Sequence, residues 1–223
     1  MKTKSKALLL ALCAVLLVAA SVLGTLAYLT SQDQVTNTFT VGKVAINLDE
    51  APVDANGKAT TDARVKANQY HLLPGHVYDK DPTVTVVAGS EAAYVRMTVK
   101  VENIDKLKGA LNDVKYYGTD GTFLLQSLCG GWDPAVWEYE KYTESTDGKI
   151  GTYEFRYKEV VSKSENSTVL DALFKTITLP GEITNESIKD LGTVKVVVNA
   201  HAIQADGFAD ADKAWTAFDA QNS

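Results

Sequence analysis

Apolar and polar side chains alternate along much of the chain, and this two-residue period predicts β-strands. Residues 94–102 place four apolar side chains on one face: Val95, Met97, Val99 and Val101. Residues 193–203 repeat the pattern, with a face made of Val194, Val196, Val198, Ala200 and Ala202. Both segments are typical of strands with one buried face. Further predicted strands are residues 83–87, 136–142, 152–161 and 173–179.

Turn signals separate these strands. Asp120-Gly121 predicts a β-hairpin over residues 115–125, and Asp147-Gly148 predicts a second one. The sequence Leu72-Leu73-Pro74-Gly75 indicates another turn. Residues 50–68 have few large apolar side chains, and we expect a surface loop or a poorly ordered hairpin there.

Three segments have the apolar spacing of short amphipathic helices, namely residues 104–111, 186–191 and 210–220. Many strands, frequent turns and few helices predict an all-β fold, an antiparallel β-sandwich with a few short helices. A β-barrel is the alternative. The predicted helices do not alternate regularly with strands, and this disfavours a fold built from βαβ units.

The N-terminus has the pattern of a secretory signal peptide, which we expect to be helical. Basic residues precede an uncharged, mostly apolar run over residues 7–23. Thr25-Leu26-Ala27 then supplies the small residues that a signal peptidase requires. We therefore expect cleavage between Ala27 and Tyr28. The alternative is a retained membrane anchor, because the apolar run nearly reaches the length that spans a bilayer.

The expected organisation has three parts: a signal peptide at 1–27, an N-terminal donor or edge strand segment at 28–48, and a β-sandwich domain at 49–223. The segment from Tyr28 to Phe39 is rich in threonine and contains neither proline nor glycine. Residues 39–48 alternate like a strand, and the phase slips near Gly42, which indicates a bulge.

Charge and cysteine content limit the partners. The chain has 22 basic and 28 acidic residues, and its net charge of −6 becomes −9 once the three leader lysines are removed. Such an acidic protein is poorly suited to bind nucleic acid or anionic lipid. Cys13 lies in the leader, so the mature chain keeps Cys129 alone and forms no intrachain disulfide.

Residue types that carry catalysis do not form recognisable motifs. His71 and His76 flank a turn, and neither they nor His201 belong to the His-Glu-x-x-His motif of zinc peptidases. No Gly-x-Ser-x-Gly elbow is present, and we interpret Cys129 as a buried structural residue. We therefore expect no enzymatic activity, no catalytic or metal-binding residues and no cofactor.

One acidic cluster is a weak candidate for a Ca²⁺ site. Asp206, Asp210 and Asp212 flank Gly207, and carboxylates at alternate loop positions can share a Ca²⁺ ion. The cluster lacks the bidentate glutamate of a calcium loop. Asp210 is also well placed to cap the helix that follows, and we favour this second interpretation.

The N-terminal region resembles a known family. The leader, followed by Tyr28-Leu29-Thr30 and later by the run Val35-Thr36-Asn37-Thr38-Phe39-Thr40-Val41-Gly42, is similar to secreted Firmicutes proteins processed by the SipW-type signal peptidase. These include the TasA and camelysin (CalY) family of biofilm matrix proteins. The Leu73-Pro74-Gly75 turn followed by Lys80-Asp81-Pro82 resembles a region of the same family, with His76 replacing its aspartate.

The resemblance implies a jelly-roll β-sandwich that is secreted by a Gram-positive cell to its matrix or surface and polymerises into fibres. The freed N-terminal segment of one copy would complete a sheet of the next copy, and head-to-tail donation of this kind does not close. The anchoring side chains of the donor strand would be Tyr28, Leu29, Val35 and Phe39.

The partners implied are other copies of the chain, the SipW-type signal peptidase and other matrix proteins. Two alternatives remain open. One is a secreted camelysin-like metallopeptidase, and the other is a monomeric cell-surface adhesin or binding module.

Overall fold

The computed structural model describes residues 6, 10–17, 42–61, 63–112 and 127–222. The chain divides into two compact units, Met1–Val41 and Gly42–Ser223. In the first unit, residues 10–17 are helical, within the predicted signal peptide. None of the helices in the described residues combines the length and apolar character that a membrane crossing requires. The cleavage site, the four donor anchors and the hairpin predicted over 115–125 lie outside the described residues.

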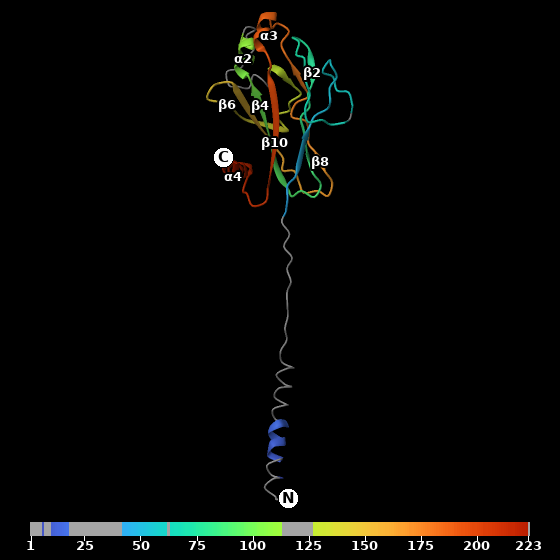
Figure 1. Ribbon diagram of the computed structural model, residues 1–223, viewed down its shortest axis with the longest axis vertical. Helices are drawn as coiled ribbons and strands as arrows, with labels where there is room; N and C mark the ends of the chain where they lie inside the picture. Colours follow the sequence, from blue (N-terminus) through green and yellow to red (C-terminus); the bar gives the residue numbers. More distant parts are fainter. Residues whose placement is uncertain (1–5, 7–9, 18–41, 62, 113–126, 223) are drawn as a thin grey trace. The chain divides into compact units, whose positions relative to one another are not determined.

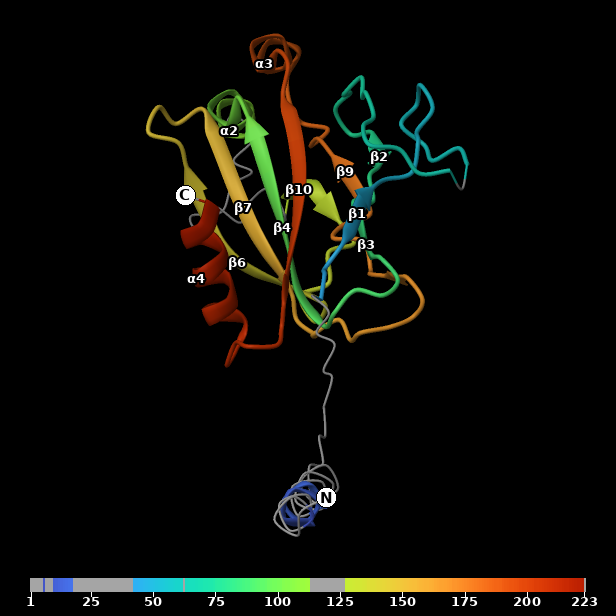
Figure 2. The same cartoon turned by 60° about the horizontal axis from the view of Figure 1, so that its bottom comes forward.

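The largest sheet of the second unit has four antiparallel strands. Their order is β10 (Lys195–Gln204), β4 (Ala93–Glu102), β7 (Ile150–Tyr157) and β6 (Trp137–Glu144). Strand β4 therefore pairs on both of its edges, and Val99 lies opposite Val198 of β10 and Tyr153 of β7. Figures 1 and 2 show β4 and β10 running side by side along the unit.

Two smaller antiparallel sheets have three strands each. The first has the order β1 (Ile46–Asp49), β3 (Thr83–Val86), β8 (Thr168–Val169). The second has the order β2 (Val77–Asp79), β9 (Thr176–Thr178), β5 (Cys129–Gly130). Strand β1 pairs with β3 of the same chain, so the last residues of the predicted donor segment belong to the folded unit.

Three short helices complete the second unit: α2 (Ile104–Asn112), α3 (Asn185–Leu191) and α4 (Ala211–Asn222). Thr184 caps α3 by accepting a hydrogen bond from the Ser187 amide, and Asp210 caps α4 by accepting one from the Lys213 amide. The structure thus confirms the predicted all-β class, with antiparallel sheets and a few short helices. It also confirms the predicted turn at Gly75, which has a φ of 72°.

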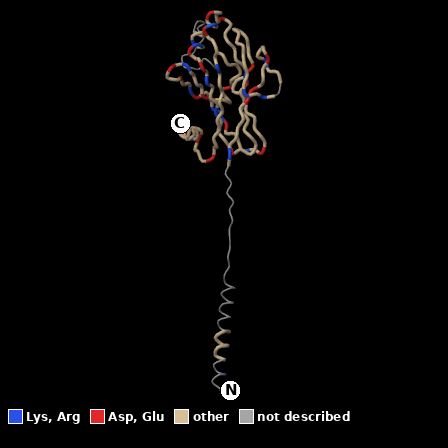
Figure 3. The backbone as a smooth tube through the Cα atoms, viewed as in Figure 1, with Lys and Arg blue, Asp and Glu red and all other residues tan. Residues whose placement is uncertain are grey.

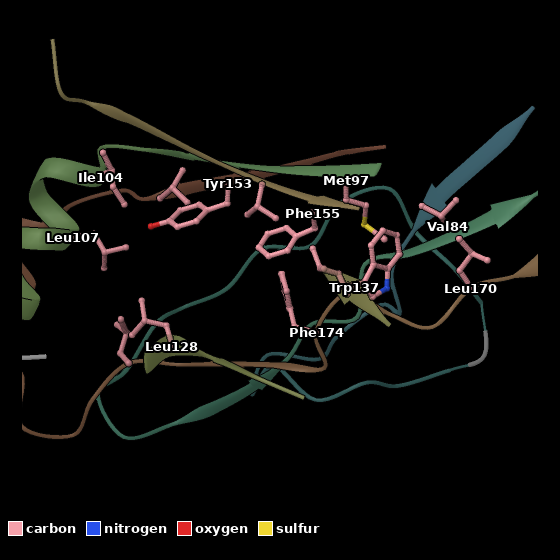
Figure 4. Packing of buried hydrophobic residues seen from close by; sticks show 14 of the residues in the cluster. Val84, Met97, Ile104, Leu107, Leu128, Trp137, Tyr153, Phe155, Leu170 and Phe174 are labelled. Carbon is pink, nitrogen blue, oxygen red and sulfur yellow. The ribbon is translucent and has the colours of Figure 1, made fainter. Parts of the chain in front are cut away.

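The core lies against the inner face of β4, as the alternating pattern predicts. Val95, Met97, Val99 and Val101 are at most 2% exposed. Aromatic side chains from β6 and β7 fill the space beside them, and Figure 4 shows Phe155 facing Phe174 across this cluster. Because these residues come from all parts of the folded unit, the core holds the three sheets together.

Residues 50–68 are better ordered than the composition suggests. Two isolated bridges, Glu50 with Val65 and Val53 with Ala59, fold the segment back on itself. Arg64 joins it to the sheets through ion pairs with Asp49 and Asp81. Ion pairs between residues distant in the sequence therefore hold this segment in place, where few apolar side chains are available to do so.

The outer face of β4 is not fully exposed, although its residues are polar. Helix α4 covers part of it, and Arg96 is only 6% exposed. The Arg96 guanidinium lies 4.5 Å from the ring centre of Trp215 and 2.6 Å from Asp219, both on α4. Cation–π attraction and a charge-assisted hydrogen bond thus fix the C-terminal helix on the sheet.

We expect the substitution Leu173→Ala to lower the free energy of unfolding by about 2–5 kcal/mol, because it opens a cavity at a fully buried position. Val169→Ala is the matched control, since Val169 is 67% exposed and its truncation should change stability by less than about 0.5 kcal/mol. Urea unfolding followed by tryptophan fluorescence measures both. Equal losses in the two variants would contradict this assignment of the core.

We also expect the docking of α4 to weaken in mild acid through His201. The His201 ring packs on Phe218 of α4 with ring centres 5.2 Å apart. Burial, and then the charge of Arg96, lower the pKa of His201 below 6.5, against smaller opposing effects of Asp219 and Glu154. The unfolded chain therefore binds more protons than the folded one just below pH 6.5, and stability falls as the pH falls through that range.

The measurement is the urea midpoint at pH 7.5 and 5.5. The wild-type protein should lose more stability between these values than the His201→Gln variant, which has no titratable ring. An unchanged pH dependence in the variant would show that His201 does not couple protonation to folding.

Candidate functional site

A cleft of about 790 Å³ lies beside strand β10. Strand β10 forms one wall. Residues from β2, β5 and β9 line the cleft as well, together with residues 66–70. Most of the lining is apolar and includes Val99, Leu128 and Phe174. In Figure 2, β10 is the strand of the large sheet that faces β9 and β1.

Strand β10 presents its backbone edge to this cleft. Every residue from Thr193 to Val198 lines it, although side chains of a strand alternate between two faces. Consecutive residues can share one cleft in this way when the edge of the strand borders it. Among the described residues β10 pairs with β4 alone. Strand β1 packs near β10 without pairing with it, so the second edge of β10 has no hydrogen-bonded strand in this part of the chain.

A buried ion pair lies in the wall of the cleft. The Lys80 ammonium donates to Glu50 with Nζ and Oε2 2.5 Å apart, and each side chain is 9% exposed. Glu50 follows β1 and Lys80 follows β2, so the pair joins the two smaller sheets. The Tyr70 ring lies 5.7 Å from Lys80 Nζ. Burial, with the Glu50 charge adding to it, raises the pKa of the Tyr70 hydroxyl.

Cys129 also lines the cleft, at the start of β5. It is a half-buried free thiol. Burial raises the pKa of the Cys129 thiol to about 12, against a smaller opposing effect of the Lys80 charge. Because the thiolate is the reactive form, this cysteine is poorly suited to act as a nucleophile at neutral pH.

The three histidines do not come together. His76 Nε2 lies 2.7 Å from the Asn56 carbonyl oxygen, His71 accepts from the Tyr78 hydroxyl through its own carbonyl, and His201 lies under α4. Across the described residues, no three His, Cys, Asp or Glu side chains gather closely enough to hold a metal ion.

The three aspartates of the candidate Ca²⁺ cluster have other contacts. Asp210 caps α4, as its position in the sequence suggests. Asp212 forms an ion pair with Arg156 of β7, 2.5 Å apart. Asp206 uses its backbone carbonyl to accept a hydrogen bond from Gln204. In this structure Asp210 therefore begins helix α4, and Asp212 joins that helix to β7.

No known family model, curated protein or solved structure matches this chain. The resemblance to the TasA and camelysin family therefore stays a prediction from the quoted residues. The cleft itself has no signal in the sequence, because Glu50, Lys80 and Cys129 meet only through the pairing of distant strands. The alternating valines of β10 predict a buried face, but they do not reveal which edge of the strand stays open.

We expect Cys129 of the mature chain to react slowly with iodoacetamide. Raising the thiol pKa from 9.0 to about 12 lowers the thiolate fraction near pH 8 by about a thousandfold. Mass spectrometry over a time course should find far slower alkylation in the native protein than in the same protein unfolded in urea, which serves as the control. Comparable rates in the two states would contradict the buried environment of the thiol.

Proposed function

We propose that this protein is a secreted subunit of an extracellular fibre and that it polymerises by strand donation. Residues 28–41 of one copy, freed by cleavage after Ala27, would enter the cleft beside β10 of the next copy. The single observation that supports this most is the edge of β10 that borders an apolar cleft and pairs with no strand of the described residues. An added strand would satisfy the open backbone groups and bury apolar side chains at the same time.

Two other sheet edges, β6 and β1, carry features that discourage pairing. Strand β6 is the opposite edge of the large sheet, and it has a register shift between Tyr139 and Lys141. It also carries several charged side chains: Glu138, Glu140, Lys141 and Glu144. Lys66 donates to the Leu48 carbonyl of β1 at 2.6 Å. Bulges, charges and covering loops are the usual protection of an edge, whereas residues 196–198 of β10 are all valine.

A jelly-roll-like β-sandwich is the finer fold that suits this function. In it, the four-stranded sheet would form one layer and the two three-stranded sheets the other. Support comes from the shared core, since Val99 and Phe155 of the large sheet belong to the same buried cluster as Val84 and Leu170. An incoming strand beside β10 would then extend the large sheet along the open side of the sandwich.

A monomeric binding module is the second candidate, and the volume of the cleft supports it. A largely apolar cleft of about 790 Å³ with a few polar groups lies in the size range of small-molecule sites. In that case the cleft would take a soluble ligand instead of a strand, and the mature protein would stay monomeric at high concentration.

The fibre proposal is tested with proteins of defined N-terminus. A protein that begins at Tyr28 should form fibres visible by electron microscopy, whereas one that lacks residues 28–37 should remain monomeric by light scattering. The reason is that the shortened protein can accept a strand but has none to donate. Added in small proportion to the full mature protein, it should shorten the fibres by ending their growth.

Two substitutions test whether fibre formation depends on the cleft or on another part of the surface. Val196→Lys places a charge in the cleft and should prevent fibre formation by the protein that begins at Tyr28. Glu138→Lys, on the protected edge strand β6, is the matched control and should leave fibres unchanged. Circular dichroism verifies that both variants fold. Fibres formed by the protein lacking residues 28–37 would overturn the mechanism.

A further inference from the structure

The buried Lys80–Glu50 pair is an unexpected feature of an apolar cleft. Removing two charges from water costs about as much as their attraction returns, so a buried ion pair is weak evidence of stabilisation. The best-attested use of such a pair is to specify register. Lys80 also has unused capacity, because an ammonium carries three N–H donors and in the described residues Glu50 alone accepts from it.

A second buried cation among the described residues has more carboxylate neighbours, although its Nε has no hydrogen-bond partner. Arg96, beneath α4, has two carboxylates from different elements: Glu154 on β7 at 3.7 Å and Asp219 on α4 at 2.6 Å. Lys80 has one carboxylate and faces the cleft. An occupant of the cleft that carries a carboxylate would give Lys80 a second partner.

The charge of the cleft agrees with this. Its charged lining consists of three lysines and one glutamate, Lys66, Lys80, Lys195 and Glu50. The local net charge is therefore +2, although the whole chain has a net charge of −6. Figure 3 shows acidic and basic positions interspersed over the rest of the folded unit. An occupant that carries a negative charge would complement the cleft.

Residues 28–41 contain a single charged side chain, Asp33. Side chains at positions two apart share a face of a strand. Leu29, Val35 and Phe39 are thus on the same face as Asp33, with Tyr28 on the opposite face. If the apolar face of an added strand enters the cleft, Asp33 enters with it.

We propose that the Lys80–Glu50 pair sets the register of the strand that occupies the cleft, and that Asp33 of a neighbouring copy binds Lys80. This inference rests on the proposed function. A shift of one residue would turn Asp33 and its apolar neighbours out of the cleft. A shift of two residues would bring Ser31 or Val35 to Lys80 and leave the Asp33 charge against apolar walls. One register therefore satisfies both the charge and the apolar side chains.

A peptide-binding experiment tests the proposal on a protein without residues 1–41, which keeps the whole compact unit Gly42–Ser223. A synthetic peptide of residues 28–41 is titrated into this protein by calorimetry, beside a peptide with Asp33→Asn. The Asn peptide should bind at least about tenfold more weakly, as expected for loss of a close charge pair in a desolvated site. A Gln34→Asn peptide, altered on the opposite face, is the control and should bind like the native one.

The partner of Asp33 is identified by a double-mutant cycle. In the protein with Lys80→Met and Glu50→Leu, which removes both charges of the pair together, the Asp33→Asn penalty should disappear. In the proteins with Lys66→Met or Lys195→Met the penalty should persist. If the penalty disappears with either of those two instead, Lys80 is not the partner and the inference is wrong.

The outcomes also separate this inference from the fibre proposal. Equal affinity of the native and Asp33→Asn peptides would overturn the register assignment and leave strand donation intact. Failure of the native peptide itself to bind would remove the basis of both. Both proposals are supported if the native peptide binds and the weaker binding of the Asp33→Asn peptide depends on Lys80.

Discussion

The structure depends on strand β4, which is paired on both edges and buried on its inner face. Its backbone pairs with β10 on one edge and β7 on the other, and its alternate side chains either enter the core or, at Arg96, pack beneath helix α4. A strand with both edges paired fixes the positions of its neighbours. The large sheet, the shared core and the C-terminal helix are all placed by contacts with this one strand.

The same arrangement leaves β10 paired on one edge only among the described residues. Because β4 occupies only one edge of β10, the other edge has backbone donors and acceptors without a strand partner among the described residues. The cleft lies beside this edge and not beside β6, whose bulge and charges disfavour pairing. We place the proposed function in this asymmetry between the two edges of one sheet.

Buried charges occur at two places where separate elements meet. Arg96 joins β4 to β7 and α4, and Lys80 joins the end of β2 to the end of β1. In both cases a cation must find its carboxylate before the surrounding apolar groups can exclude water, so each pair selects one mutual arrangement of its elements. Helix α4 covers Arg96, whereas Lys80 and Glu50 lie in the wall of the cleft.

The sequence by itself determined the strands with a clear two-residue period, above all β4 and β10, the all-β class and the Asp210 cap, because these depend on neighbouring residues. It did not determine the order of residues 50–68, the burial of Arg96 or the cleft beside β10. Those depend on pairings between positions far apart, such as Glu50 with Lys80 and Arg96 with Asp219. Local patterns report which face of a strand is buried, but only the tertiary structure decides which edge stays open.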